Sequence, residues 1–287
     1  GEEHSRSSHL LLPQAVMQIL LSGGSRLAYH VEHEHMALAR ILKNKAGLPD
    51  SQVDKICAND RYGTLAMQAV MAFEPLPYTP RTFENIFGFC IANKVKSHFI
   101  DAAKYILDAG TNKKYLNRRD KDTEAAIAAY YYGNNLRPDS IVPVESVEGM
   151  SIRNKLMVQK SLTQAKYDGA DVVLVHCGYQ HLFGSTSSGF NYSDSLAAQF
   201  RKCGIDPYVV IPSYKGNIGD IPAEAREANH LVTVVEGLFD ISLPRMDEVE
   251  NQIIDGVVGH SGGAVTRHDV TNKIPQWRRN FSADAKA

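Results

Sequence analysis

The chain has 287 residues, 44% of them hydrophobic, so it can bury a sizeable core as one large domain or two small ones. Charged residues make up 22% and the formal net charge is -1, which excludes the strongly basic surface that nucleic acid or an anionic membrane would attract. We therefore expect a partner that is a small molecule or a peptide, and no nucleic acid.

The first 45 residues predict a helix, a strand and a second helix. Residues 10–22 are suited to a helix if Pro13 lies in its first turn, and Gly23-Gly24 would end that helix. Residues 26–32 read as a short strand whose last residues are polar, and residues 36–45 are again helical. Polar side chains at the end of a strand indicate a sheet edge at which a site could lie.

The middle of the chain, about residues 50–145, shows a helical pattern with little sign of strands. Prolines at 75, 77 and 80 interrupt it, residues 81–108 predict one or two amphipathic helices, and residues 121–132 predict another. We expect this stretch to be a helical insertion or cap within a single domain of residues 1–287.

After residue 150 helices and strands alternate. Residues 151–170 and 193–203 are helical in pattern, and residues 171–177 form a nearly continuous apolar run, typical of a strand buried on both faces. Residues 207–211 and 231–235 predict two more strands. This order favours an α/β fold with a parallel sheet and helices on both faces. In such sheets, ligands bind beyond the carboxyl ends of the strands.

Three segments combine Glu and His, and two of them directly follow predicted strands. They are Gly1-Glu2-Glu3-His4, Glu32 at a strand end, and Gly178-x-x-His181 after the strand of residues 171–177. Carboxylate and imidazole groups carry out general acid–base chemistry near neutral pH. The same side chains, His4, Glu32 and His181, could instead ligate a divalent metal.

Other histidines and a cysteine have plainer interpretations. His33 and His35 could be no more than part of a solvated turn between strand and helix. Cys177 follows His176, but adjacent strand residues point to opposite faces, so a buried inert thiol is the favoured interpretation over a nucleophile pair.

Two blocks of the chain, residues 1–40 and 150–205, resemble a known family. The opening Gly1-Glu2-Glu3-His4, a helix and a strand ending in Glu32 are similar to the opening of ChaN-type haem-iron uptake proteins, which reads G-E-x-H, helix, strand, Glu. Arg153-Asn154-x-x-Met157 resembles that family's R-D-x-x-M, with Asn154 where Asp is usual, and Gly178-x-x-His181 resembles its G-x-x-H. The superfamily also includes erythromycin esterases, TIKI proteases, TraB-type proteins and a domain of some bacterial toxins.

The resemblance implies an α/β fold with a Glu/His site, and it leaves several activities open. The first is hydrolysis of an ester or amide bond, with or without a metal; the others are haem or metal binding without turnover, and an effector or toxin role. In the hydrolase, His4 would be the general base or a metal ligand, and Glu2 and Glu32 would orient it. His181 would bind the oxyanion or the metal. Arg153 would hold a carboxylate or a site glutamate, with Glu3 and Gly178 as further binding residues.

The four cysteines, Cys57, Cys90, Cys177 and Cys203, form no C-x-x-C pair, which argues against a thiolate zinc site and fits free thiols in a reducing compartment. No apolar run reaches the length of a membrane span. Because the chain starts at Gly1, a targeting segment could have preceded it, so we expect a soluble protein that is cytoplasmic or is secreted as an effector or toxin.

Overall fold

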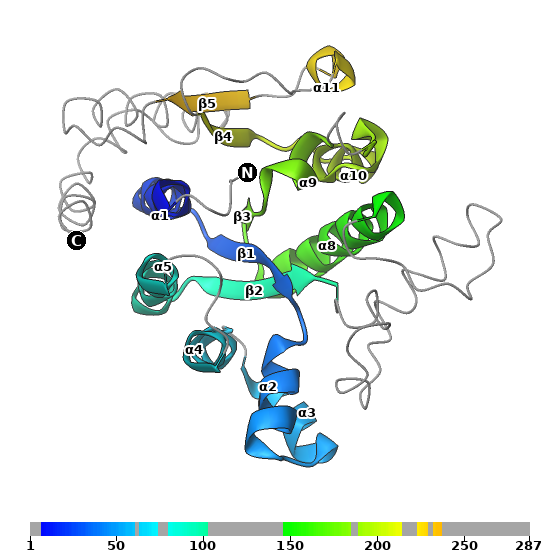
Figure 1. Cartoon of the computed structure of the whole chain (residues 1–287). Coiled ribbons are helices and arrows are strands. Elements are labelled where there is room, and N and C mark those ends of the chain that lie inside the picture. The colour runs from blue at the N-terminus through cyan, green and yellow to red at the C-terminus, as the bar shows by residue number, and fades with distance from the viewer. Residues whose placement is uncertain are drawn as a thin grey trace.

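The computed structural model describes residues 7–60, 63–73, 80–102, 146–184, 189–213, 223–228 and 232–236. They form an α/β fold around a three-stranded parallel sheet in the order β2-β1-β3, which confirms the expected fold class (Figure 1). The strands of this sheet are β1 (Leu27–Glu34), β2 (Lys96–Asp101) and β3 (Val172–His176).

Most of the described chain outside the sheet is helical. The helices are α1 (Ser7–Ser22), α2 (Ala37–Ala46), α3 (Asp50–Asn59), α4 (Thr64–Phe73), α5 (Pro80–Ala92), α8 (Val147–Asp168), α9 (Tyr179–Phe183), α10 (Leu196–Lys202), α11 (Ala223–Glu227) and the 3-10 turn η2 (Tyr192–Asp194).

The central strand β1 divides the sheet into an apolar and a polar face, because alternate residues of a strand point to opposite sides. Tyr29 and Val31 join the main hydrophobic core with residues of α1, α4 and α5. His30 and Glu32 point the other way and bond to residues of α8. Helices thus cover both faces of the sheet, as expected, and the polar face is the one beneath α8 (Figure 1).

The long helix α8 has a capping residue at each end, and its residue spacing places polar side chains on the face toward the sheet. The hydroxyl of Ser146 caps its first turn, where Glu148 also lies, and Gly169 ends it in the left-handed conformation with φ 63°. Arg153 and Ser161 are eight residues apart, about two turns, so both face the sheet and bond to residues of β1. The helix therefore carries polar groups onto the polar face of β1.

Strand β2 corrects the expectation of a helical middle. The three helices α3, α4 and α5 occupy much of residues 50–92, but residues 96–101 pair with β1 as an edge strand. Lys94, with φ 55°, turns the chain out of α5, and the strand then begins at Lys96. Residues 103–145, including the expected helix at 121–132, lie outside the described residues.

The remaining strands, β4 (Val209–Ser213) and β5 (Val232–Glu236), pair in parallel as a separate two-stranded sheet. Val209 and Ile211 of β4 pack with Phe183 of α9 and Ala197 of α10. Both strands match the sequence expectations, and in Figure 1 they lie beyond β3, on the β3 side of the main sheet.

The first helix differs from expectation at its start. It begins at Ser7, so Pro13 lies in its second turn rather than in its first. Proline there removes the backbone donor to the carbonyl of residue 9. The buried side chains that follow, including Val16, Met17 and Ile19, offset the cost by packing into the core. Within the described residues no helix combines the length and the apolar character needed to cross a bilayer.

Candidate active site

Glu32 lies in an irregularity at the carboxyl end of β1. The pairing with β2 runs from Val31 opposite Phe99 to Glu34 opposite Asp101, so β1 has one extra residue there. Such a bulge bends a strand and re-aims its side chains, and bulges are frequent next to active sites. Here the Glu32 carboxylate points at α8 and at the turn after β3, and its side chain is only 7% exposed.

The Glu32 carboxylate has donors on both oxygens. Oε1 accepts a hydrogen bond from Arg153 Nη2 at 2.7 Å and lies 3.1 Å from His181 Nε2. Oε2 accepts from the backbone N–H of Gly178 at 2.7 Å. The structure therefore brings together Glu32, Arg153, Gly178 and His181 at the carboxyl edge of two neighbouring parallel strands.

Arg153 is the centre of this network, and two of its nitrogens are occupied by carboxylates of the protein. Its side chain is 1% exposed, and its Nε and Nη2 bind the two carboxylate oxygens of Asp101 at 3.0 and 2.8 Å while Nη2 also binds Glu32. Of its two expected roles, holding a substrate carboxylate or holding a glutamate, the geometry supports the second. Arg153 is a positioning residue that fixes two buried carboxylates with one planar fork.

His181 is held from both sides. Its Nδ1 lies 2.5 Å from Asn154 Oδ1, and Asn154 donates its amide Nδ2 to the carbonyl of Asp194 at 2.9 Å, which sets the orientation of the amide. Its Nε2 faces Glu32. Both ring nitrogens therefore face side-chain oxygens that accept hydrogen bonds.

The charges in the network set the ionisation of Glu32. Burial alone would raise its pKa, but the charge and hydrogen bond of His181, the charge of Arg153 and the N–H of Gly178 outweigh burial and hold the pKa well below its usual range. Glu32 is thus an anion at neutral pH. Two carboxylates, Glu32 and Asp101, both bind the guanidinium of Arg153.

The metal expected on His4, Glu32 and His181 stays a prediction, because His4 lies outside the described residues. Among the described residues, both oxygens of Glu32 accept from protein donors and both ring nitrogens of His181 face acceptors. An oriented carboxylate beside an imidazole suits electrostatic and acid–base chemistry.

The N-terminal motif with Glu2, Glu3 and His4 lies outside the described residues. The roles of these three side chains as base, orienting group and binding residue remain predictions.

Sequence reasoning did not identify Asp101 or a role for Asn154. Asp101 ends a strand in a segment that the sequence predicts to be helical, and residues 95–101 show no polar/apolar alternation that would have revealed that strand. Asn154 stood out because its position differs from the R-D-x-x-M pattern. A neutral amide there supplies an acceptor for His181 without adding a third carboxylate.

His33, His35 and Cys177 make packing or hydrogen-bond contacts within the fold, outside the network around Glu32. His33 packs its ring against Phe99 with centroids 4.8 Å apart, and His35 Nδ1 lies 2.6 Å from the carbonyl of Asp101. Both are half-buried, so the turn is packed rather than solvated. Cys177 is 1% exposed in an apolar cluster beneath α8, while the Nδ1 of the adjacent His176 lies 2.6 Å from the hydroxyl of Tyr29.

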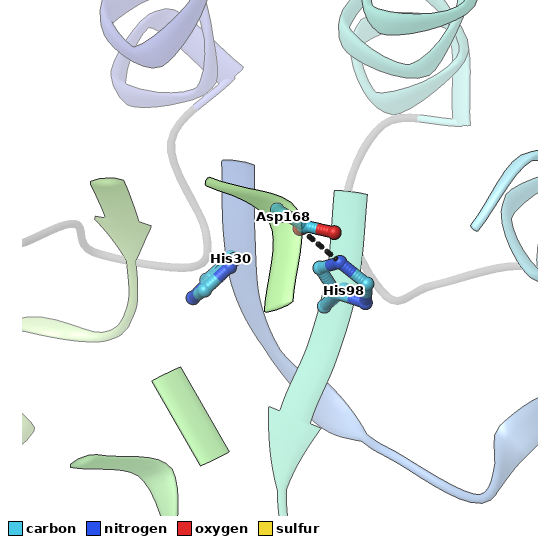
Figure 2. A group of neighbouring side chains, drawn as sticks. All are labelled: His30, His98 and Asp168. Atoms are coloured by element: carbon cyan, nitrogen blue, oxygen red, sulfur yellow. Dashed lines mark hydrogen bonds and ion pairs between the residues drawn. The ribbon is translucent and has the colours of Figure 1, made fainter. Parts of the chain in front are cut away.

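A second polar cluster lies beneath the same helix. His30 of β1, His98 of β2 and Asp168 at the end of α8 each offer one atom that could ligate a metal ion, and these atoms lie within 4.8 Å of one another (Figure 2). Burial lowers the pKa of His30 to about 3, with a further contribution from the charge of His98, so its ring is neutral at pH 7. This cluster could hold a metal ion, and sequence reasoning missed it because it depends on the unexpected strand β2.

Comparisons of the chain with protein-family models, with curated proteins and with solved structures gave no match. The inferences below therefore rest on the residues and their geometry.

Proposed function

We propose that the protein is a hydrolase that cleaves an ester or amide bond at the carboxyl edge of its main sheet. The observation that carries the proposal is the buried Glu32–His181 pair, fixed by Arg153 and Asn154 at the end of two parallel strands. Ligands of parallel sheets bind at that edge. The groups present there are an oriented carboxylate and an imidazole, which the proposed mechanism uses in its protonated form, and acyl transfer requires groups of these kinds.

The proposed roles divide between charge stabilisation and proton transfer. The Nε2–H of His181 turns from Glu32 toward the carbonyl oxygen under attack and stabilises the negative charge that develops on it. His4 takes a proton from the attacking water, and Glu2 orients His4. Glu32 compensates the charge of His181, while Arg153 holds Glu32 in place and does not contact the substrate.

The resting geometry supports this division because the contact with His181 is the longest of the three contacts that Glu32 makes with Arg153, Gly178 and His181. It measures 3.1 Å, against 2.7 Å from Glu32 to Arg153 and 2.7 Å to Gly178. A substrate oxygen can therefore compete for the Nε2–H of His181 while Glu32 keeps its other two donors. In the proposed mechanism, the protonated ring of His181 then stabilises the negative charge on the carbonyl oxygen under attack.

The test is a hydrolysis assay on the full chain with p-nitrophenyl esters and fluorogenic peptide amides. His4→Ala should lower kcat by about 100-fold or more with a smaller change in KM, because a base acts mainly in the transition state. His33→Gln, which removes a histidine from the same strand as Glu32 but outside the network, should stay close to the parent rate.

Two results would contradict the proposal. His4→Ala could turn over a substrate at the parent rate with folding intact, in which case His4 is not the base. Alternatively, no substrate could react above the protein-free rate while added haem gives a Soret band, which would favour a haem-binding protein without turnover.

A further inference from the structure

Three titratable side chains from distant parts of the chain meet beneath α8, one step further from the carboxyl edge than Glu32. His30 and His98 are opposite each other in the β1–β2 pairing, so their side chains share a face, and their rings meet edge to face with centroids 5.4 Å apart. Asp168, the last residue of α8, brings Oδ2 to 2.7 Å from His98 Nε2 (Figure 2).

The surroundings of His30 suit a metal ligand. Its residue is 0% exposed, its Nδ1 lies 2.8 Å from the hydroxyl of Ser161, and its Nε2 has no hydrogen-bond partner among the described residues. A buried ring nitrogen without a partner is costly, and a cation that accepts its lone pair removes that cost. Ser161 then acts as the outer partner that fixes the tautomer and the ring orientation, as is usual for histidines that bind metals.

A positive charge next to the buried carboxylate of Asp168 would stabilise it. Its side chain is 1% exposed at the C-terminal end of a 22-residue helix, where the helix dipole disfavours an anion. Lys96 supplies part of this charge: its Nζ lies 3.4 Å from Asp168 Oδ1 and donates to the Asp168 carbonyl oxygen at 3.3 Å. Oδ1 nevertheless lacks a hydrogen-bond partner among the described residues, so a cation bound to this carboxylate would satisfy both the charge and the oxygen.

We propose that His30, His98 and Asp168 form a binding site for a divalent transition metal of the zinc class. Two imidazoles and one carboxylate are ligands that zinc accepts, whereas magnesium and calcium prefer oxygen ligands alone. Ligand atoms of a tetrahedral zinc ion are about 3.4 Å apart, whereas the atoms here lie within 4.8 Å of one another, so the most distant pair closes by up to about 1.4 Å and the His98–Asp168 contact of 2.7 Å opens slightly. Lys96 gives up its ion pair with Asp168.

The bound metal joins three elements that are distant in sequence, β1, β2 and the end of α8. Such a site exists only in the folded protein, so binding stabilises the fold. The His98 side chain on β2 is the most exposed of the three ligands, at 17%, so we expect an ion to enter from its side. The site is separate from Glu32 and His181, so it needs no hydrolase activity.

The experiment measures thermal unfolding of the untagged full chain with zinc, and absorption with cobalt. A Cys203→Ser background removes an exposed thiol that could bind either metal. Zinc at about 100 times its Kd should raise the melting temperature by about 5 °C or more, while magnesium should not. Cobalt should give the d–d absorption of a low-coordinate site with no thiolate band.

The zinc-induced shift in melting temperature, measured in variants of single residues, tests whether the metal binds at His30, His98 and Asp168. His98→Gln and Asp168→Asn should each lose most of the zinc shift, whereas His33→Gln, a histidine variant on the same sheet, should keep it. Lys96→Met leaves all three ligands in place and removes the competing cation, so zinc affinity should rise several-fold.

Three outcomes would overturn the proposal. The parent protein could show no shift with zinc and no cobalt spectrum. The shift could persist in both His98→Gln and Asp168→Asn, which would locate the metal elsewhere. Should those two variants fail to fold, an unchanged zinc affinity in Lys96→Met would exclude a metal on Asp168.

Discussion

Replacing Arg153 with methionine should destabilise the protein strongly, because it removes the cation between two buried carboxylates. Arg153 is 1% exposed and binds Asp101 with two nitrogens and Glu32 with one. After the substitution Glu32 keeps His181 and Gly178, but Asp101, whose side chain is 0% exposed, loses its guanidinium partner. Methionine fills a similar volume, so the change isolates the charge from the packing.

The magnitude follows from what remains buried. Removing one partner of a buried ion pair costs about 3–5 kcal/mol, because the other charge stays in a medium that solvates it poorly. Arg26→Met is the matched control. Arg26 makes a similar two-nitrogen pair with Asp171, but the two side chains are 73% and 48% exposed, and water can replace the lost partner.

The assay is urea unfolding at pH 7, with the free energy of unfolding compared among the parent, Arg153→Met and Arg26→Met. We expect Arg153→Met to lose several times as much stability as Arg26→Met. Equal losses in the two variants would refute the reasoning, since they would mean that the Arg153 network is as solvated as a surface pair.

Three further stability predictions rest on separate features. Gly63→Ala should lower the free energy of unfolding in urea far more than Gly24→Ala. Both glycines have positive φ, but a Cβ on Gly63 would clash with the carbonyl oxygen of Ser97, whereas one on Gly24 meets nothing within 4 Å. Equal losses in the two variants would contradict this packing. His30 is protonated in the unfolded chain below about pH 6.5 but in the fold only near pH 3, so its contribution, up to about 5 kcal/mol, is complete above pH 6.5 and is lost as the pH falls toward 3. Glu32, with a lowered pKa, likewise contributes above about pH 4.3 and loses its contribution below that. His30→Gln should flatten the stability profile between pH 6.5 and 4.5, and an unchanged slope there would contradict the burial of a neutral His30.

The carboxyl edge could be predicted because its signals are local. The apolar run of β3 and the polar end of β1 are visible in the sequence, and parallel strands bring their carboxyl ends to one edge. That rule alone puts Glu32 near His181, although 149 positions separate them in the chain. Arg153 was identified through a motif, and its partner Glu32 was among the partners expected for it.

The second cluster could not be predicted in the same way, because it depends on pairing register. Nothing local in the sequence sets His30 opposite His98, 68 positions away, and the strand that carries His98 has no continuous apolar run. Asp168 adds a further contact across 70 positions, at a helix end whose orientation is set by packing on the sheet. The same missed strand hid Asp101, the second carboxylate bound by Arg153.

The central claim, that the Glu32–His181 edge performs hydrolysis, is tested most directly by the turnover of His181→Gln. Glutamine can still form hydrogen bonds with Asn154 but cannot carry a positive charge to the developing oxyanion. Once a substrate is found, kcat should fall by about 100-fold or more while circular dichroism and urea unfolding show a folded protein. A folded His181→Gln that hydrolyses the substrate at the parent rate would contradict the account.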